Sequence, residues 1–401
     1  MAETKSESDV RWFSSGAMKV PAMASAAGNV RRHHPEHGRP HRSDINPPFE
    51  MMPSKTSAVP LALAMATLSA SAQILSIDLS NYQRVGRYDL PEPTRTTAPS
   101  GNLLAQEASG VTYNRDTGTL FVIGDGGRSV TQVSKTGQLV DTMTLAADIT
   151  KPRGVYFDDP EGITYVSSGT DAGKFVLIEE RTRLASLFTY AAGTTLGPGS
   201  SFQSVKLGTS IGNVGIEGMS FDPATGGYVA VKEISPMGIF QTGIDFASGN
   251  ASNGSASTAN SVNLFDPALA GTADFGDVFA LSNILPGTSG QYDQLLVLSQ
   301  ESGKIVQMDR AGNILSSLTI TSDLGNSLSL PEQQHEGLTM DTDGNLYVVS
   351  ENGGGDIDHP QLWVYSSVSP VPEPSAYAVV VGLGALAFGI FRRVRKSSSS
   401  L

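Results

Sequence analysis

The sequence predicts an all-β fold, a five-bladed β-propeller, on three observations. A short acidic phrase recurs with spacings of 54, 56, 60 and 59 residues. Each phrase is followed by the same order of strand, turn and apolar strand, and a fixed period of this size is typical of repeat architectures. Glycine is frequent, at 43 residues, and only 16% of residues are charged, which suits short strands joined by turns. The recurring acids are Glu107, Glu161, Glu217, Asp277 and Glu336.

Within one repeat the elements follow a constant order. A short strand such as residues 111–113 leads into a turn rich in Asn, Asp and Gly, as at residues 114–118. A second strand such as residues 120–123 is apolar on both faces, which predicts that it is buried in the middle of a sheet. A third and a fourth strand complete the unit, as at residues 305–308 and 314–320. Four antiparallel strands repeated in this way are typical of a propeller blade.

The fifth repeat shows only three clear strands, the last at residues 362–365. Residues 82–90 precede the first repeat, and we predict that they supply the missing outer strand. This arrangement would join the two ends of the repeat region and remove an exposed sheet edge. Residues 241–275 are rich in Gly, Ala, Ser and Asn and are interpreted as a long surface insertion. A β-sandwich is the alternative architecture, but it does not explain the period.

Composition excludes several functions. The chain has no cysteine, so a disulfide scaffold, a thiolate zinc site and a cysteine nucleophile are excluded. The net charge is −12; residues 1–72 carry +2 and the basic cluster at 392–396 carries +4, so the region between them carries −18. Such an acidic body repels phosphate backbones, and nucleic acid is therefore not expected as a partner.

The N-terminal region is predicted to be an export address. Residues 1–50 show no sustained apolar period and are interpreted as disordered sequence from a wrongly assigned start. Residues 51–72 have a lysine-containing start, an apolar run and a final Ala-Ser-Ala, the order of a signal peptide cleaved by signal peptidase. The alternative is an apolar segment of a folded N-terminal domain. The propeller is then expected to span residues 73–368.

Residues 369–401 are predicted to be a sorting and anchoring tail. The motif Val371, Pro372, Glu373, Pro374 precedes an apolar stretch at 376–391 and a basic cluster, which the positive-inside rule keeps cytoplasmic. This order resembles the PEP-CTERM sorting signal of Gram-negative bacteria. The resemblance implies a transmembrane segment, cleavage by an exosortase-type protease, and a cell that makes an extracellular polysaccharide matrix. An ordinary C-terminal membrane anchor is the alternative, and either assignment places the body outside the cytoplasm.

The repeat phrases resemble the SdiA-regulated family of bacterial proteins, distant relatives of NHL-repeat propellers, over about residues 75–366. The resemblance implies a five-bladed propeller with a bound calcium ion. The residues that carry it are 107–113, 159–163, 215–218 with Lys232 and Glu233, 295–302, 335–337 and 346–351.

Rotation about the propeller axis would bring equivalent acids to one mouth of the central channel. Neighbouring carboxylates repel each other, and a hard divalent cation removes that cost, since calcium accepts six to eight oxygen ligands. The alternative is that each acid accepts backbone N–H bonds and caps its own blade. The candidate metal ligands are Glu161, Glu217, Asp277 and Glu336.

A second, weaker set is assigned to the channel rim. The acids Asp125, Glu180, Glu233, Glu301 and Glu351 each follow an apolar strand. Glu107 joins this set because the resemblance does not require an acid in the first blade. His335 precedes Glu336, which suggests acid–base chemistry, although a single histidine near a channel is more often a hydrogen-bonded structural residue.

These observations favour an exported, calcium-binding propeller of the cell envelope that acts as a binding or structural module, displayed at the outer surface or in the matrix. No catalytic constellation stands out in the sequence. The alternative is a calcium-dependent hydrolase, such as a lactonase, an esterase or a phytase-like enzyme, in which the ion polarises a carbonyl or phosphoryl oxygen. An open position on the ion would favour the enzyme, and a fully protein-closed site would favour the structural role.

Overall fold

A computed structural model describes residues 76–91, 104–210, 212, 214–253, 262–320, 334–351 and 360–368. Within these ranges the chain forms strands and three short 3-10 helices, η1 (Leu79–Asn81), η2 (Pro267–Ala270) and η3 (Leu281–Asn283). The predicted all-β class is confirmed. Among the described residues no helix is long and apolar enough to cross a bilayer.

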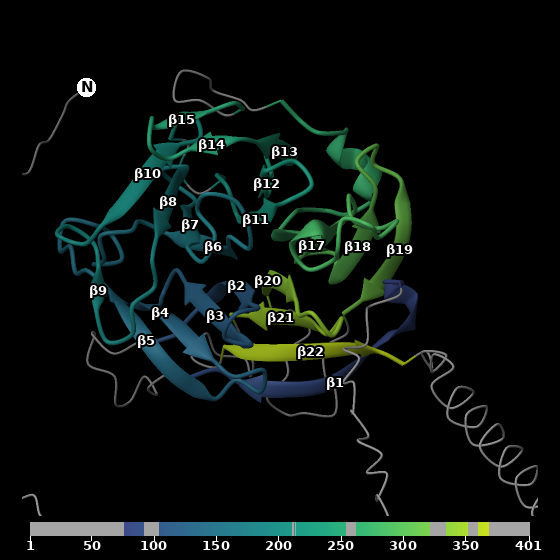
Figure 1. Ribbon diagram of the computed structural model, residues 1–401, viewed down its shortest axis with the longest axis horizontal. Coiled ribbons are helices and arrows are strands. Elements are labelled where there is room, and N and C mark those ends of the chain that lie inside the picture. The colour runs from purple at the N-terminus through teal and green to yellow at the C-terminus, as the bar shows by residue number, and fades with distance from the viewer. Residues whose placement is uncertain are drawn as a thin grey trace, which may run out of the picture. The chain divides into compact units, whose positions relative to one another are not determined.

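Five sheets surround a central axis (Figure 1). Blade one consists of β2 (Ala108–Asn114), β3 (Thr119–Gly124), β4 (Ser129–Val133) and β5 (Leu139–Leu145), with β9 (Thr195–Leu196) added in parallel to β5. Blade two consists of β6 (Pro160–Tyr165), β7 (Phe175–Glu179), β8 (Leu184–Phe188) and β10 (Phe202–Lys206). Blade three consists of β11 (Gly218–Asp222), β12 (Gly227–Lys232) and β13 (Gly238–Thr242).

The last two blades follow the same plan. Blade four consists of β16 (Asp277–Ala280), β17 (Leu295–Ser299), β18 (Lys304–Met308) and β19 (Ile314–Thr319). Blade five consists of β20 (His335–Met340), β21 (Leu346–Ser350), β22 (Gln361–Ser367) and β1 (Tyr82–Asp89). The predicted five-bladed architecture is therefore confirmed.

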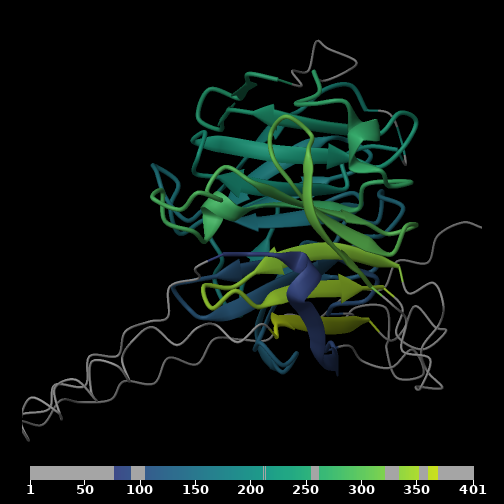
Figure 2. The same ribbon diagram turned by 90° about the vertical axis from the view of Figure 1, so that its right-hand side faces the viewer.

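Strand β1 closes the ring as predicted. It pairs antiparallel with β22, from Tyr82 opposite Ser367 to Asp89 opposite Gln361 (Figures 1 and 2). The first described strand of the chain thus forms the outer edge of the last blade. Because the first and last parts of the repeat region share one sheet, the ring is closed by backbone hydrogen bonds.

The predicted insertion lies beside blade three. Its described part forms the small hairpin of β14 (Ile244–Asp245) and β15 (Asn250–Ala251), followed by η2. Residues 254–261 lie outside the described residues. So do the predictions for residues 1–50, 51–72 and 369–401, including the span 376–391 and the motif at 371–374.

Apolar side chains fill each junction between neighbouring blades. The second strands contribute to both sides, as the alternation of side chains along a strand requires. In β3, Phe121 and Ile123 pack with blade two, while Leu120 and Val122 pack with blade five. The buried residues form five such clusters, one for each junction. This two-sided burial explains why the second strands are almost continuously apolar.

The innermost strands contact each other in the cyclic order β2, β6, β11, β16, β20 and back to β2. At four junctions a hydroxyl of one innermost strand accepts a backbone N–H bond from the next strand. The accepting residues are Thr112, Thr164, Ser220 and Thr339. Phe279 occupies this position in β16, where Asp277 instead accepts the N–H of Leu338, at 2.7 Å.

Candidate functional site

Strand register defines which residues are equivalent at the start of each innermost strand. Four glycines pair with the same position of the second strand, with Ile123, Ile178, Val231 and Val349 as partners. These glycines are Gly110, Gly162, Gly218 and Gly337. In blade four the equivalent pair is Asp277 with Leu298. Asp277 therefore occupies the glycine position, and Gly276 precedes it where the other blades carry a polar side chain.

These glycines allow neighbouring innermost strands to approach closely. A Cβ atom on Gly110 would lie 2.7 Å from the Glu161 carbonyl oxygen, and one on Gly337 would lie 2.7 Å from the Ser109 carbonyl oxygen. Contacts this short exclude a side chain without a shift of backbone. The residue before each glycine is thereby held close to the axis, next to its counterpart in the adjacent blade.

A cavity of about 300 Å³ lies at this end of the ring. Two sets of equivalent positions line it, one at the start of the first strand of each blade and one directly after the second strand. The first set is Ser109, Glu161, Glu217, Gly276 and Glu336. The second set is Asp125, Glu180, Glu233, Gln300 and Glu351. Gln334 and Arg153 complete the described lining, in which seven carboxyl groups face a single guanidinium.

The acids of the first set are poorly solvated. Burial, followed by repulsion from Asp125 and Asp159, raises the pKa of Glu161 well above its usual value. Burial and the charges of Glu161 and Glu180 do the same to the pKa of Glu217. Burial, with Glu351 and Glu161 next in importance, raises the pKa of Glu336 well above its usual value. In each case a nearby positive charge would favour the ionised form.

The second set behaves similarly, with smaller shifts. Burial raises the pKa of Asp125 to about 8, with Glu107 contributing next and Arg153 opposing. Burial is also the main cause that raises the pKa of Glu180 to about 7 and that of Glu351 to about 7. The pKa of Glu233 is raised by burial and by Asp274. The cavity therefore concentrates more acid groups than it can hold ionised without a cation.

Arg153 supplies one positive charge to a side of the cavity. It lies between β5 and β6, and its side chain is one-third exposed. Its Nη1 donates to Glu107 Oε2 at 2.8 Å, its Nη2 pairs with Asp125, and its Nε lies 3.5 Å from Asp159 Oδ1. Three nitrogen atoms of one guanidinium thus contact three different carboxylates.

The structure brings together most, but not all, of the residues proposed from the sequence. Glu161, Glu217 and Glu336 line the cavity, as do Asp125, Glu180, Glu233 and Glu351. Glu107 contacts the cavity through its ion pair with Arg153.

Asp277 and Glu301 lie one residue away from the cavity positions of blade four. The carboxylate of Asp277 accepts the backbone N–H groups of Val278 and Leu338, each at 2.7 Å. Exposed Glu301 follows Gln300, which lines the cavity in its place.

His335 points into a blade junction. Its ring centroid lies 4.9 Å from that of Trp363 in an edge-on arrangement, and the residue is 5% exposed. Burial lowers the pKa of His335 to about 4, which keeps the imidazole neutral near pH 7. His335 is outside the described cavity lining, and its Nε2 is buried without a hydrogen-bond partner among the described residues.

Sequence reasoning missed several residues of the site. Ser109 follows the Glu107 that the acidic spacing selected, and Gly276 and Gln300 carry no acid, so a search for recurring acids passes over them. Arg153 lies between two repeats and belongs to no period. The available signal was the position before the recurring glycine, which identifies Ser109, Glu161, Glu217 and Glu336 together.

The donor atoms of the cavity fit a hard cation. Carboxylate, amide and hydroxyl oxygens line it, and the described lining contains no histidine. Asp125 Oδ1 and Glu217 Oε1 are buried and accept no hydrogen bond from the described residues. Oxygen donors at this density suit calcium or magnesium and not zinc.

These features define a closed five-bladed propeller with an acidic cavity at one end of its channel. The chain belongs to the SdiA-regulated family, whose sequence model matches residues 95–353. The resemblance seen in the repeat phrases is thereby confirmed.

Three of the solved structures to which the chain is similar have sequences 9–12% identical to it. A luciferin-regenerating enzyme has a TM-score of 0.39 and 9% identity, over 66% of this chain and 92% of that one. The glutaminyl cyclase of Myxococcus xanthus has a TM-score of 0.38 and 10% identity, over 71% and 95% of the two chains. A chain of the nidogen/laminin complex has a TM-score of 0.37 and 12% identity, over 67% and 90%. The activities in these names belong to those proteins.

Proposed function

We propose that this protein is a calcium-binding propeller that serves as a binding or structural module of the cell envelope. Glu161, Glu217 and Glu336 are the proposed ligands, from blades two, three and five. The observation that carries the proposal is their convergence, with four further carboxyl groups, in one cavity. Calcium would supply two positive charges to these oxygens and tie three blades together at the axis.

The unpaired oxygens support this proposal. Buried carboxylates without partners are costly, and a cation ligated by them removes the cost. Glu217 Oε1 is such an oxygen, and Ser109, Gln300 and Gln334 add neutral oxygen donors around the same space. Asp277 is left out of the proposed ligand set because both of its oxygens already accept backbone N–H bonds.

The proposed location rests on the sequence alone. Removal of residues 51–72 by signal peptidase would export the propeller, and the motif at 371–374 would direct it to an exosortase-type protease. The apolar segment 376–391 would hold it in the membrane at least until that step. An outer-surface or matrix location, among extracellular polysaccharide, follows from this sorting route. The acidic body is compatible with such a solvated environment.

A calcium-dependent hydrolase is the second candidate. The cavity volume of about 300 Å³ lies at the lower end of the range for small-molecule sites, so it has space beside a single ion. A substrate oxygen could then reach an open position of the ion and be polarised by it. Lactone, ester and phosphoester substrates, each assayed with calcium and with chelator, test this candidate independently of binding.

Thermal unfolding of the full chain with calcium and with EGTA tests the principal proposal. At calcium one hundred times above Kd, binding adds about 2.7 kcal/mol, which corresponds to a rise in Tm of roughly 4 °C for a domain of this size. Glu217→Gln should abolish most of this rise. The matched control is Glu301→Gln, outside the cavity, which should keep it. An equal Tm in calcium and EGTA for the unaltered chain would refute calcium binding.

A further inference from the structure

One side of the cavity already contains a cation, and the protein supplies it. The guanidinium of Arg153 contacts Glu107, Asp125 and Asp159 through three different nitrogen atoms. Arg181 Nε reaches the other oxygen of Asp159 at 2.7 Å. Arginine keeps its charge at every relevant pH and matches carboxylate geometry, so it is a permanent counter-ion.

The acids beneath Arg153 have the spacing of a metal site. One carboxylate oxygen from each of Asp125, Asp159 and Glu161 lies within 4.8 Å of the other two. All three residues are buried, with exposed fractions of 7%, 1% and 8%. Oxygens at this separation can contact one calcium ion at its usual distance of about 2.4 Å.

The arginine leaves part of this group without a partner. Asp125 Oδ1 is buried and accepts no hydrogen bond from the described residues, although Oδ2 of the same side chain is paired with Arg153. The side chain of Asp125 is only 9% exposed, and it lines the cavity. A buried carboxylate oxygen without a hydrogen-bond donor, on a side chain that lines the cavity, is costly unless a cation contacts it.

We propose that Asp125, Asp159 and Glu161 form a second cation site, which Arg153 holds closed by acting as a tethered cation. Glu161 borders both this site and the one proposed with Glu217 and Glu336. Arg153 therefore sets the ion count to one and directs the ion to the side of blades three and five. The chain between β5 and β6 keeps the guanidinium at high effective concentration, so free calcium cannot readily displace it.

The number of bound ions tests the second site. The full chain is dialysed to equilibrium against calcium, and the metal content per chain is measured by atomic absorption. Arg153→Met removes the charge but keeps an aliphatic side chain of similar reach. This variant should bind one calcium ion more than the unaltered chain. Arg153→Gln repeats the test with a different neutral side chain. If a variant folds only in the presence of calcium, its bound calcium is measured after refolding in calcium.

Two controls locate the additional ion. Arg153→Lys keeps the positive charge and should keep the count of the unaltered chain. The double variant Arg153→Met with Asp125→Asn should lose the additional ion, because it removes one of the three ligands. Arg181→Met leaves Arg153 in place and should also keep the original count.

The outcomes separate this inference from the proposed function on which it partly rests. Counts of one and two, for the unaltered chain and Arg153→Met, support both proposals. Counts of zero and one refute the first calcium site but support the second. An equal count in the two proteins overturns the second site, whatever that count is.

Discussion

The two ends of the innermost strands place the same kind of residue in opposite situations. Where the strands begin, Glu161, Glu217 and Glu336 share one cavity with other acids. Where β11 and β20 end, Asp222 and Asp341 are each buried, with side chains 0% exposed, and each has its own cation. The first group is short of positive charge and the second group is not.

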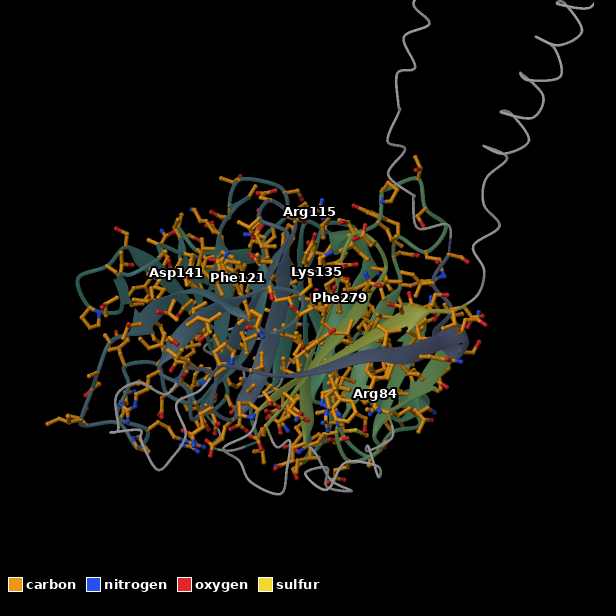
Figure 3. All side chains as sticks on the ribbon, turned by 90° about the horizontal axis from the view of Figure 1, so that it is seen from below. Arg84, Arg115, Phe121, Lys135, Asp141 and Phe279 are labelled. Atoms are coloured by element: carbon orange, nitrogen blue, oxygen red, sulfur yellow. The ribbon has the colours of Figure 1, made fainter. Side chains whose placement is uncertain are left out.

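At the end with Asp222 and Asp341, which we call the paired end, each ion pair joins two neighbouring blades. Arg310, in the turn before β19 of blade four, reaches Asp222 of blade three at 2.8 Å. Lys135, in the turn before β5 of blade one, reaches Asp341 of blade five at 2.6 Å; Figure 3 labels Lys135 on the same side of the molecule as Arg115, which follows β2. In both pairs a basic residue from one blade neutralises an aspartate of the preceding blade around the ring.

The pKa shifts of Asp341 and Glu217, one residue from each end, differ in sign. Burial would raise the pKa of Asp341, but hydrogen bonds from Lys135 and Asn345 hold it below its usual value. Burial raises the pKa of Glu217, and its neighbours raise it further because they are themselves acids. The partner, and not the burial, distinguishes a carboxylate that holds the fold together from one available to an external cation.

The largest expected effect is on the pH dependence of stability without metal. The pKa is about 8 for Asp125 and about 7 for Glu180 and Glu351, against about 4 in an unfolded chain. Between these values the folded state binds more protons than the unfolded state, so stability falls as pH rises. The free energy of unfolding in urea, measured from pH 5 to 8 in EGTA, should decrease steadily.

Calcium should flatten this dependence, because its two positive charges favour the ionised form of the carboxyl groups around it. Glu179 provides an internal control: burial raises its pKa to about 7, but it lies outside the cavity lining and contributes equally with and without metal. Asp341, with its lowered pKa, should lose its contribution only below about pH 4. If the free energy of unfolding depends on pH in the same way in calcium and in EGTA, the cavity acids do not differ from the paired aspartates in their response to a cation.

The next largest effect is at the paired end. Arg310→Met leaves Asp222 buried without its cation, and breaking a buried pair costs about 3 kcal/mol or more. The loss should appear as a lower midpoint in urea, with an unchanged response to calcium. Lys151→Met is the matched control, because Lys151 is one-third exposed and 4.0 Å from Asp158, and should cost less than about 1 kcal/mol. Equal losses of stability in Arg310→Met and Lys151→Met would contradict the distinction between a buried and an exposed ion pair.

The period in the sequence was sufficient for the architecture. It predicted five blades and the closing strand β1, because each blade repeats the same alternation of apolar residues and turns. It also selected Glu161, Glu217 and Glu336 by the spacing of the acids, and in the structure each precedes a glycine that permits close strand approach.

The rest of the site depends on register and on loop geometry. In blade four the glycine position holds Asp277, so the recurring acid and the cavity position differ by one residue. Arg153 comes from a connection between blades, where only the folded chain shows which carboxylates it meets. Neither feature recurs with the repeat period, so neither could be predicted from a single sequence.

The smallest effect is expected for Asp277 in blade four. Its substitution should leave calcium binding almost unchanged, and this result tests the strand register of that blade. Asp277→Asn removes an acid that the spacing alone makes equivalent to Glu217. In the structure its oxygens accept N–H bonds from Val278 and Leu338. Asparagine has one oxygen and must present its amide group to one of these donors, so the variant should lose about 1–2 kcal/mol of stability. Its calcium affinity, measured by calorimetry, should remain within about twofold, since a charge satisfied elsewhere contributes little to the ion.

Glu217→Gln should behave in the opposite way, with at least a tenfold loss of affinity because it removes a ligand charge. Without metal the same variant should be as stable as the unaltered chain or more so, since a buried acid has been replaced by a neutral amide. A tenfold loss of affinity in Asp277→Asn would mean that its carboxylate turns to the ion when calcium binds. Blade four would then contribute an acid to the cavity, and the division between cavity acids and junction acids would have to be redrawn at that blade.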